Sequence, residues 1–368
     1  RYGAPADIRF LYNPHLGSNK IRQCITRMLD DLEIRESDVR YMTRFTDFAT
    51  DGDGAVTKVR THDGQAIDTD ALFLATGHSA REVYAMLRGR DTPMTLKEFA
   101  VGVRVEHPAA AVNDMQYGTE HRQRYPGIET AQYKLAKTWT DESRAVYSFC
   151  MCPGGYVLNA SSDVTGVVTN GMSNYLKSGR FSNAAIVVNV SAQDLARAGY
   201  TGIDAALAFQ AELEARFRAS VNAPGSVHAL PGQRLQDFLQ GSASHALLPS
   251  SCVSPVAPAP MHTLLPAFLH DGLRRGFDSF ERKMRGFSKL EQAQVFGIES
   301  RTSAPYRIER QRQLTSPAHP NFYPVGEGAG YAGGITSAAV DGIRAAQAWL
   351  HTMIEPAPCF VETTGARS

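Results

Sequence analysis

The spacing of hydrophobic residues near the start of the chain is first helical and then extended. Five apolar residues fall on one helical face and predict a helix over residues 20–32: Ile21, Ile25, Met28, Leu29 and Leu32. Three extended runs follow at 39–48, 55–61 and 66–75, separated by tight turns in which Asp precedes Gly. They predict a three-stranded meander, whose last part, residues 71–75, is apolar enough to be buried on both faces.

The rest of the pattern indicates one domain inserted into another. Helices are predicted at 79–87, 203–219, 264–285 and 336–353, and strands at 99–106, 145–152, 166–169, 186–190 and 322–325. We therefore expect an α/β fold with four parts along the chain. These are the first part of one domain (1–98), an inserted domain of mixed α+β type (99–305), the second part of the first domain (306–353) and a tail (354–368).

Composition restricts the class of partner. A chain of 368 residues, 43% of them hydrophobic, is long enough for two domains. The 38 Lys and Arg nearly balance the 37 Asp and Glu, and no basic stripe is present, so we expect a small-molecule partner and no nucleic acid. No apolar stretch approaches the roughly 20 residues of a membrane-spanning helix, so no membrane partner is expected. Nothing in the sequence indicates the oligomeric state.

The cysteines indicate a reducing environment. They number five, which is odd and few for the length, so a cytoplasmic location is expected. Because the chain begins with Arg1 and not Met, we expect its natural N-terminus, with any organelle targeting segment, to be missing. Cys150 and Cys152 lie two apart on a predicted strand and so share a face. A redox pair there would be a strained disulfide, so buried, unreactive cysteines are expected.

The densest candidate for chemistry is the glycine cluster at 324–335. A strand, a run of glycines and a helix follow one another, and Gly328, Gly330 and Gly333 have the GxGxxG spacing. Glycines let a cofactor approach the backbone, and the N-terminus of the helix favours a phosphate or an anionic ring oxygen. A tight turn that packs a helix against a strand explains the same spacing equally well. Too little chain follows to complete a Rossmann βαβ unit.

A second candidate is the turn after the apolar strand at 71–75. The sequence Gly77-His78-Ser79 resembles the nucleophile elbow of a serine hydrolase, with Ser79 as nucleophile. That motif requires a small residue two places after the serine, where Arg81 stands. The alternative is a turn at which Ala75, Thr76 and Gly77 pass beside a bound nucleotide.

Two charged residues near the end of the inserted domain are further candidates. Glu299 and Arg301 share a face if this segment is extended, and they would bind an anionic substrate or form a buried ion pair. Metal binding has no support, because no CxxC or HExxH motif is present and the eleven histidines are scattered.

Six segments together carry a family resemblance. They are 75–81 (ATGHSAR), 99–107 (FAVGVRVEH), 149–155 (FCMCPGG), 169–173 (TNGMS), 299–303 (ESRTS) and 324–334 (PVGEGAGYAGG). In this order they resemble the signature blocks of a largely uncharacterised family of FAD-dependent dehydrogenases, related to flavoproteins with a glutathione-reductase-like FAD domain. The resemblance runs from about Tyr2 to Leu350 and is far more specific than any single block.

The resemblance implies a two-domain flavoprotein. Residues 1–98 and 306–353 would form an incomplete Rossmann-like FAD/NAD(P)-binding domain, and 99–305 a substrate domain. The implied cofactor-binding residues are Phe45, near the adenine; Ala75, Thr76 and Gly77, beside the nucleotide; Gly326 and Glu327, at the ribityl and pyrophosphate; and Gly328, Gly333, Gly334 and Ile335, on the flavin side. Glu327 stands where many relatives carry Asp. Full-length members are similar in beginning with a strand, a GxGxxG turn and a helix that hold the ADP half of FAD. None precedes Tyr2, so this chain is expected to bind FAD poorly unless the missing part is supplied.

The implied activity is hydride or electron transfer through noncovalent FAD to or from an unknown small molecule, with NAD(P)H as a candidate electron donor. The substrate is expected between the domains, near 152–156 and 299–301, with Cys152, Glu299 and Arg301 as catalytic candidates. Two alternatives stay open: a serine hydrolase that uses Ser79, and a noncatalytic flavin-binding or regulatory module.

Overall fold

The chain folds into two compact units, each made of two segments. The computed structural model describes residues 1–11, 14–221 and 229–354. Unit 1 joins Arg1–Met42 to Glu98–Thr302, and unit 2 joins Thr43–Lys97 to the chain from Ser303 onward. Residues 1–42, which the sequence analysis assigned to the first part of the FAD-binding domain, therefore belong with the inserted segment. Most of the tail expected at 354–368 lies outside the described residues.

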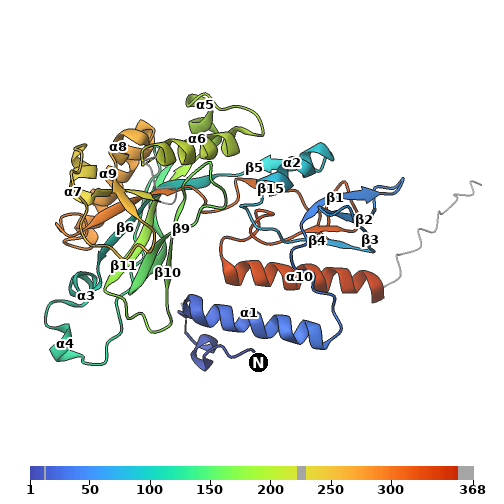
Figure 1. Cartoon of the computed structure of the whole chain (residues 1–368), viewed down its shortest axis with the longest axis horizontal. Helices are drawn as coiled ribbons and strands as arrows, with labels where there is room; N and C mark the ends of the chain where they lie inside the picture. The colour runs from blue at the N-terminus through green and yellow to red at the C-terminus, as the bar shows by residue number, and fades with distance from the viewer. Residues whose placement is uncertain (12–13, 222–228, 355–368) are drawn as a thin grey trace, which may run out of the picture. The chain divides into compact units, whose positions relative to one another are not determined.

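Unit 1 is built on a mixed sheet of seven strands in its described part (Figure 1). In spatial order the strands are β13 (Val256–Pro258), β12 (Leu230–Arg234), β14 (Gln294–Glu299), β6 (Phe99–Pro108), β11 (Phe181–Val190), β8 (Arg144–Cys152) and β7 (Ala136–Trp139). All neighbours are antiparallel except β12 and β13. The central strands β6, β11 and β14 are almost wholly buried because they carry long apolar runs with structure packed on both faces.

Helices cover one face of this sheet. Helix α9 (Ala267–Lys283) contacts β6, β7, β8 and β11, while α6 (Ala205–Ala219) and α7 (Leu235–Gln240) contact β12 and β14. Two glycines let α9 lie close to the sheet. A Cβ on Gly272 would come 3.0 Å from Val188, and one on Gly276 would come 2.4 Å from Val146. Larger residues at these positions would push the helix off the sheet.

A two-stranded ribbon packs against the same sheet. It pairs β9 (Gly155–Asn159) with β10 (Thr169–Ser173), and β10 contacts β6, β8, β11 and β14. Helix α1 (Gly17–Ile34) contacts β10. The shorter helical elements of unit 1 are η1 (Ala6–Arg9), α3 (Ala109–Tyr117), α4 (His121–Arg124), α5 (Ala192–Arg197) and α8 (Met261–Leu264).

Unit 2 contains three small sheets and two helices in its described part. The meander is formed by β1 (Phe45–Thr50), β2 (Val56–Thr61) and β3 (Ala66–Asp68); the other pairs are β4 (Leu72–Leu74) with β16 (Phe322–Pro324), and β5 (Met94–Leu96) with β15 (Tyr306–Ile308). The helices are α2 (Arg81–Gly89) and α10 (Ile335–Ile354). The meander was predicted correctly, but its third strand ends at Asp68. The apolar segment 72–74 forms a separate strand that pairs in parallel with β16.

The long-range pairing of β4 with β16 organises the core of unit 2. Tyr323 stacks on Phe73 with ring centroids 4.6 Å apart, and Trp349 of α10 meets Phe73 edge-on at 6.0 Å. The Asn321 side chain bonds both the N–H and the C=O of Val56, which ties β16 to the meander. Phe73 is 36% exposed, so the expectation that residues 71–75 are buried on both faces was wrong.

The predicted helices all exist, and most predicted strands do. The exception is 166–169, which precedes β10 and includes only its first residue. The predicted apolar face of α1 is present but is not buried: Ile25, Met28 and Leu32 are 44–50% exposed.

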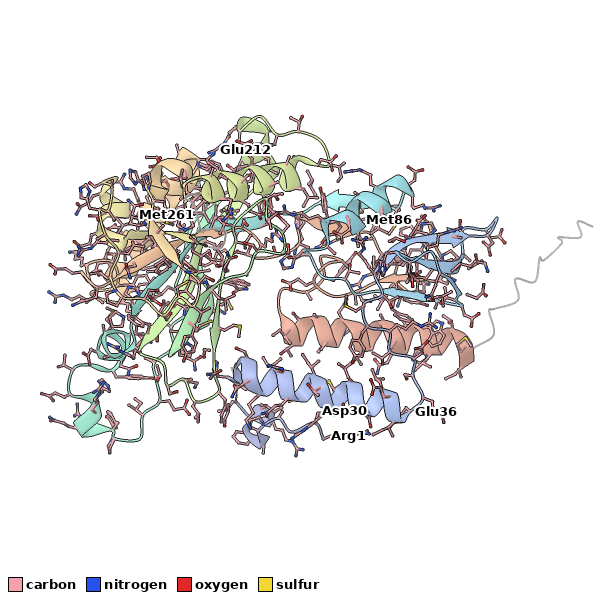
Figure 2. The ribbon with its side chains drawn as sticks, viewed as in Figure 1. Arg1, Asp30, Glu36, Met86, Glu212 and Met261 are labelled. Atoms are coloured by element: carbon pink, nitrogen blue, oxygen red, sulfur yellow. The ribbon has the colours of Figure 1, made fainter. Side chains whose placement is uncertain are left out.

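Figure 2 labels two side chains with contrasting surroundings in unit 1. Met261 is fully buried, whereas Glu212 is on the surface and pairs with Arg216. Over residues 1–11, 14–221 and 229–354, no helix combines the length and apolar character needed to cross a membrane.

Candidate functional site

The two glycine-containing turns of unit 2 meet at one edge of the β4–β16 pair. Because the two strands are parallel, the turns that follow them, 75–77 and 326–328, leave from the same end. A Cβ on Gly328 would lie 2.4 Å from the carbonyl oxygen of Gly77, so the backbones are in direct contact. The Tyr84 hydroxyl donates to the carbonyl oxygen of Gly328 at 2.8 Å and holds the second turn in place.

An open groove of about 760 Å³ lies where α10 begins. Its lining residues include Tyr331, Gly333, Gly334, Ile335 and Thr336. A Cβ on Gly333 or Gly334 would meet nothing within 4 Å, so the backbone faces open space on this side. The first N–H groups of α10 have no acceptor within the helix and carry its positive dipole end.

Charged groups beneath the groove are arranged around Asp341. Its carboxylate accepts from the Gly326 amide at 2.7 Å and from the Arg310 guanidinium at 3.0 and 3.1 Å. Arg310 lies 3.5 Å from the ring centroid of Tyr331. The negative charge of Asp341 is therefore neutralised by a close ion pair, and it fixes the conformation of the Gly326 turn.

Glu327 and His78 face each other across the two turns. The Nδ1 of His78 lies 3.6 Å from Oε1 of Glu327, and both side chains are mostly buried. Lys97 is also nearby: burial and the positive charge of Arg307 lower its pKa, and Glu327 opposes that shift. Glu327 is thus a negative charge close to His78 and Lys97.

Ser79 does not have the surroundings of a hydrolase nucleophile. It is exposed, its backbone carbonyl accepts from the Arg81 N–H, and α2 begins only at Arg81. Among the described residues, no histidine is hydrogen-bonded to its hydroxyl. His78, the residue before it, is directed to Glu327 instead.

Phe45 lies apart from these turns within unit 2. It opens β1 in the meander and pairs with Thr61. No ring or hydrogen-bond contact joins its side chain to the glycine turns within the described residues. Its proximity to an adenine stays a prediction.

In unit 1, Glu299 belongs to a buried ion pair with Arg104. Both oxygens of Glu299 accept from the guanidinium, at 2.8 and 3.0 Å, and Arg104 is fully buried. Burial disfavours the charged guanidinium, but the Glu299 carboxylate outweighs this effect and raises the pKa of Arg104. Arg104 also donates to Asn183 and to the carbonyl of Cys150. With every oxygen of Glu299 engaged, its structural role is the better supported of the two predicted.

Arg301 forms a second, separate ion pair, with Glu214. Its Nε and Nη2 donate to the two Glu214 oxygens at 3.0 and 2.8 Å, and Nη1 donates to Ser162 at 2.6 Å. Burial lowers the pKa of Arg301, but the Glu214 carboxylate outweighs it and raises the pKa overall. Glu299 and Arg301 therefore do not bind each other, and each is paired from another element of unit 1.

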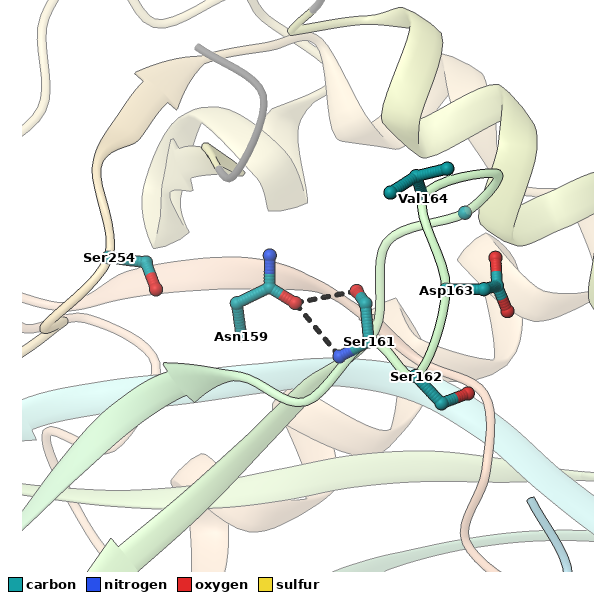
Figure 3. Close-up of a pocket in the computed structure, with 7 residues that line it drawn as sticks. Asn159, Ser161, Ser162, Asp163, Val164 and Ser254 are labelled. Atoms are coloured by element: carbon teal, nitrogen blue, oxygen red, sulfur yellow. Dashed lines mark hydrogen bonds between the residues drawn. The ribbon is translucent and has the colours of Figure 1, made fainter. Parts of the chain in front are cut away.

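A cavity of about 330 Å³ (Figure 3) is lined in part by Ser162, the residue to which Arg301 donates. It is lined largely by the loop that joins β9 to β10, including Ser161, Ser162 and Asp163, with Ser254 opposite. The Asn159 side-chain oxygen accepts from the N–H and hydroxyl of Ser161 and fixes the start of this loop. Asp163 of the cavity wall lies 3.7 Å from Arg301.

The two neighbouring cysteines differ in their surroundings. Cys152 is buried, as expected, but Cys150 is exposed, so the expectation of two buried cysteines was wrong. The reason is an irregularity in β8. Phe149 pairs with Ala185 and Cys152 with Asn183, so one extra residue is accommodated between them and the side chains no longer alternate regularly.

Sequence reasoning missed several residues that shape these sites: Tyr84, Arg104, Glu214, Arg310 and Asp341. Arg104 did carry a signal, because a charged residue inside the apolar run of residues 99–105 must find a buried partner. The others stand in ordinary amphipathic or loop segments, where nothing local distinguishes them from surface residues.

Comparison with known proteins identifies the inserted segment. Residues 98–302 match the family model described as FAD-dependent protein, C-terminal domain-like. An uncharacterised protein of Clostridium beijerinckii is 35% identical over 349 residues, which cover 94% of this chain and 63% of that protein. The chain thus spans less than two thirds of the length of this relative.

Two solved structures show weaker likeness. CtdE in complex with FAD and a substrate is 9% identical, with a TM-score of 0.34, covering 91% of this chain and 57% of that one. P. aeruginosa PqsL in complex with 2-aminobenzoylacetate is 14% identical, with a TM-score of 0.23, covering 51% and 40%. These values are too low to assign a fold or a ligand. The match to the family model, in contrast, covers more than half of the chain and coincides with the second segment of unit 1, Glu98–Thr302. The chain therefore belongs to the family described as FAD-dependent protein, C-terminal domain-like, and is a flavin-related protein.

Proposed function

We propose that this chain is part of an FAD-dependent oxidoreductase, with unit 2 forming the flavin side of a glutathione-reductase-like, Rossmann-like domain. The observation that carries the proposal is the meeting of the turns 75–77 and 326–328 at the carboxyl ends of two parallel strands, beside the start of α10. In open α/β sheets, nucleotides and cofactors bind at this end of the strands. Membership of an FAD-dependent family supports the same assignment.

The residues present fit a flavin nucleotide. Gly77 has a φ of +73°, which few other residues adopt, and a Cβ there would meet open space. Gly333 and Gly334 are equally unobstructed along the groove. The backbone can therefore approach a flat ring or a phosphate closely, with the exposed Ile335 available to cover an apolar part of it.

Electrostatics at the groove favour an anionic group. The dipole of α10 directs its positive end there, and Arg344 lines the groove. Asp341 does not oppose this, because Arg310 neutralises its charge. In this proposal Ala75, Thr76 and Gly77 pass the nucleotide, and Gly326 and Glu327 bind toward the ribityl and pyrophosphate. His78 holds the Glu327 carboxylate in place.

When bound, FAD would supply hydride or electron transfer. The chain's own residues would bind it, orient it and exclude water. The Clostridium beijerinckii relative is longer than this chain. We therefore propose an unknown small-molecule substrate, NAD(P)H as electron donor and a cytoplasmic location for the whole protein. The ion pairs of Glu299 and Arg301 favour structural over catalytic roles for these two residues.

The test uses the complete gene product and its visible flavin spectrum. We expect a protein that carries FAD or binds it when added. Gly333→Val should weaken FAD affinity at least tenfold, about 1.4 kcal/mol, because the new side chain would fill space that is open in the chain itself. The unfolding midpoint should not change. Gly342→Val is the matched control, since a Cβ there also meets nothing within 4 Å but Gly342 does not line the groove.

Three outcomes would count against the proposal. A colourless full-length protein that added FAD leaves unchanged would refute flavin binding. Equal FAD affinity in Gly333→Val and the control would refute the assigned groove. A protein whose bound FAD is reduced by dithionite but by neither NADH, NADPH nor any other electron donor tried would be a noncatalytic flavin-binding module.

A further inference from the structure

The backbone at Cys150 is strained in a way that exposes its side chain. Cys150 has a φ of +47°, in the left-handed region that costs a residue other than glycine on the order of 1 kcal/mol or more. It lies within the irregularity of β8, where the strand turns locally, and the residue is exposed. Such strain persists only where surrounding contacts hold it.

The contacts that hold Cys150 also bring Cys152 and a buried cation to it. The Cys150 carbonyl accepts from Arg104 Nη1 at 3.2 Å and from the Cys152 thiol at 3.4 Å. On the opposite side, a Cβ on Gly171 would come 3.0 Å from the Cys152 sulfur and 2.4 Å from Arg104 Nη1. Only glycine fits there without displacing the group.

The two thiols are made unequal by their surroundings. A side-chain hydrogen bond between the two thiols, distinct from the bond to the Cys150 carbonyl, lowers the pKa of Cys150 to about 6. Burial and the Glu299 carboxylate oppose this shift, and the positive charge of Arg104 adds to it. The same hydrogen bond, with burial, raises the pKa of Cys152 well above its ordinary value. The lowered pKa favours the thiolate form of Cys150, and the raised pKa favours the protonated thiol of Cys152.

Two buried polar groups beside the pair lack partners within the described residues. They are Nδ2 of Asn183, which is opposite Cys152 in the sheet, and the Tyr133 hydroxyl, whose pKa is raised by burial and by Cys152. Buried donors without acceptors are uncommon in folded proteins. The Asn183 amide and the Tyr133 hydroxyl are therefore able to donate hydrogen bonds to an oxygen added to a cysteine sulfur at this site.

We propose that Cys150 and Cys152 form a redox-active dithiol, in which Cys150 is the peroxide-reactive nucleophile and Cys152 the resolving thiol. This inference does not depend on flavin binding, because both cysteines and their partners lie within unit 1.

The reaction proceeds in two balanced steps with a hydroperoxide as oxidant. The Cys150 thiolate attacks one peroxide oxygen; an S–O bond forms, the O–O bond breaks, and the leaving alkoxide or hydroxide takes up a proton. Cys150 is then a sulfenic acid, oxidised by two electrons. The Cys152 sulfur attacks the Cys150 sulfur, an S–S bond forms, the S–O bond breaks, and the hydroxide leaves as water with the proton of Cys152.

The first test is the rate of alkylation by iodoacetamide at pH 7, followed by peptide mass spectrometry of the whole chain. Cys359 lies outside the described residues and is replaced by Ser in all variants. Cys252 is the internal comparison, since burial raises its pKa to about 11. At pH 7 the fraction present as thiolate is larger for Cys150 than for Cys252 by a factor of about 10⁴. The thiolate of Cys252 is intrinsically the more nucleophilic, by a factor of about 10². Cys150 should therefore react at least tenfold faster than Cys252. Equal rates would overturn the proposal.

The second test adds one equivalent of hydrogen peroxide. We expect both thiols to disappear together and dithiothreitol to restore them, with a disulfide between Cys150 and Cys152 in the peptide map. Cys152→Ser should instead give a sulfenic acid that dimedone traps at Cys150, and Cys150→Ser should leave Cys152 unmodified. Circular dichroism checks that each variant is folded. A sulfinic acid at Cys150 with Cys152 still reduced, or no oxidation at either residue, would refute the dithiol.

Discussion

Replacing Gly328 with alanine tests whether the two glycine turns of unit 2 lie in direct contact. The added Cβ would lie 2.4 Å from the carbonyl oxygen of Gly77, whereas ordinary contact begins near 3.4 Å. The turns must therefore separate by about 1 Å, and the Tyr84 hydrogen bond to Gly328 must lengthen with them. Overpacking of this kind costs about 1–3 kcal/mol, which changes the ratio of folded to unfolded protein by a factor of roughly 5 to 150.

The assay must report on unit 2 alone, because two compact units need not unfold together. The chain has two tryptophans, and Trp349 packs near Phe73 in the core that joins β4 to α10. In a Trp139→Phe background its fluorescence during urea titration follows unit 2. We expect Gly328→Ala to lower the midpoint without changing the slope.

The matched control is Gly342→Ala, a helical glycine whose Cβ would meet nothing within 4 Å. It should raise the free energy of unfolding by about 0.5–1 kcal/mol, because alanine has the higher helix propensity. The structure would be contradicted if Gly328→Ala had the same urea midpoint as the parent while Gly342→Ala had a higher free energy of unfolding. In that case the two glycine turns would not be in contact.

Two further predictions concern unit 1. Glu299→Gln should destabilise it by about 3–5 kcal/mol, because Arg104 would stay buried without its counter-charge; a double variant with Arg104→Met should recover part of that loss in urea unfolding, and no recovery would contradict the ion-pair account. Burial lowers the pKa of His107 to about 4, below its ordinary 6.5, so the unfolded state binds the proton more tightly. Its contribution, on the order of 3 kcal/mol, is fully present above pH 6.5 and is lost as the pH falls toward 4. His107→Gln should flatten the pH dependence of the unfolding free energy in that window, and an unchanged profile would contradict it.

Much of the local structure could be predicted from the sequence. The glycine cluster at 324–335 does separate β16 from α10, and the helices at 203–219 and 264–285 exist close to their predicted bounds. These features follow from periodicity and turn chemistry, which depend on neighbours a few residues apart.

Pairings across the chain were beyond that reasoning. The segment 72–74 reads as the end of the meander, yet it pairs with Phe322–Pro324, about 250 residues later. Likewise, the spacing of Glu299 and Arg301 predicts that they share a face, but their ion-pair partners are Arg104 and Glu214. A charged residue in an apolar strand requires a partner, and the sequence does not state which one.

The sequence by itself determined which segments are helical or extended, where the glycine turns lie and which family blocks occur, because these properties follow from local backbone sterics and side-chain spacing. Only the tertiary structure decided that the two glycine turns touch, that Cys150 is exposed beside buried Arg104, and that residues 1–42 pack with the inserted segment. The physical reason is that strand pairing and buried ion pairs are settled by competition among many distant partners.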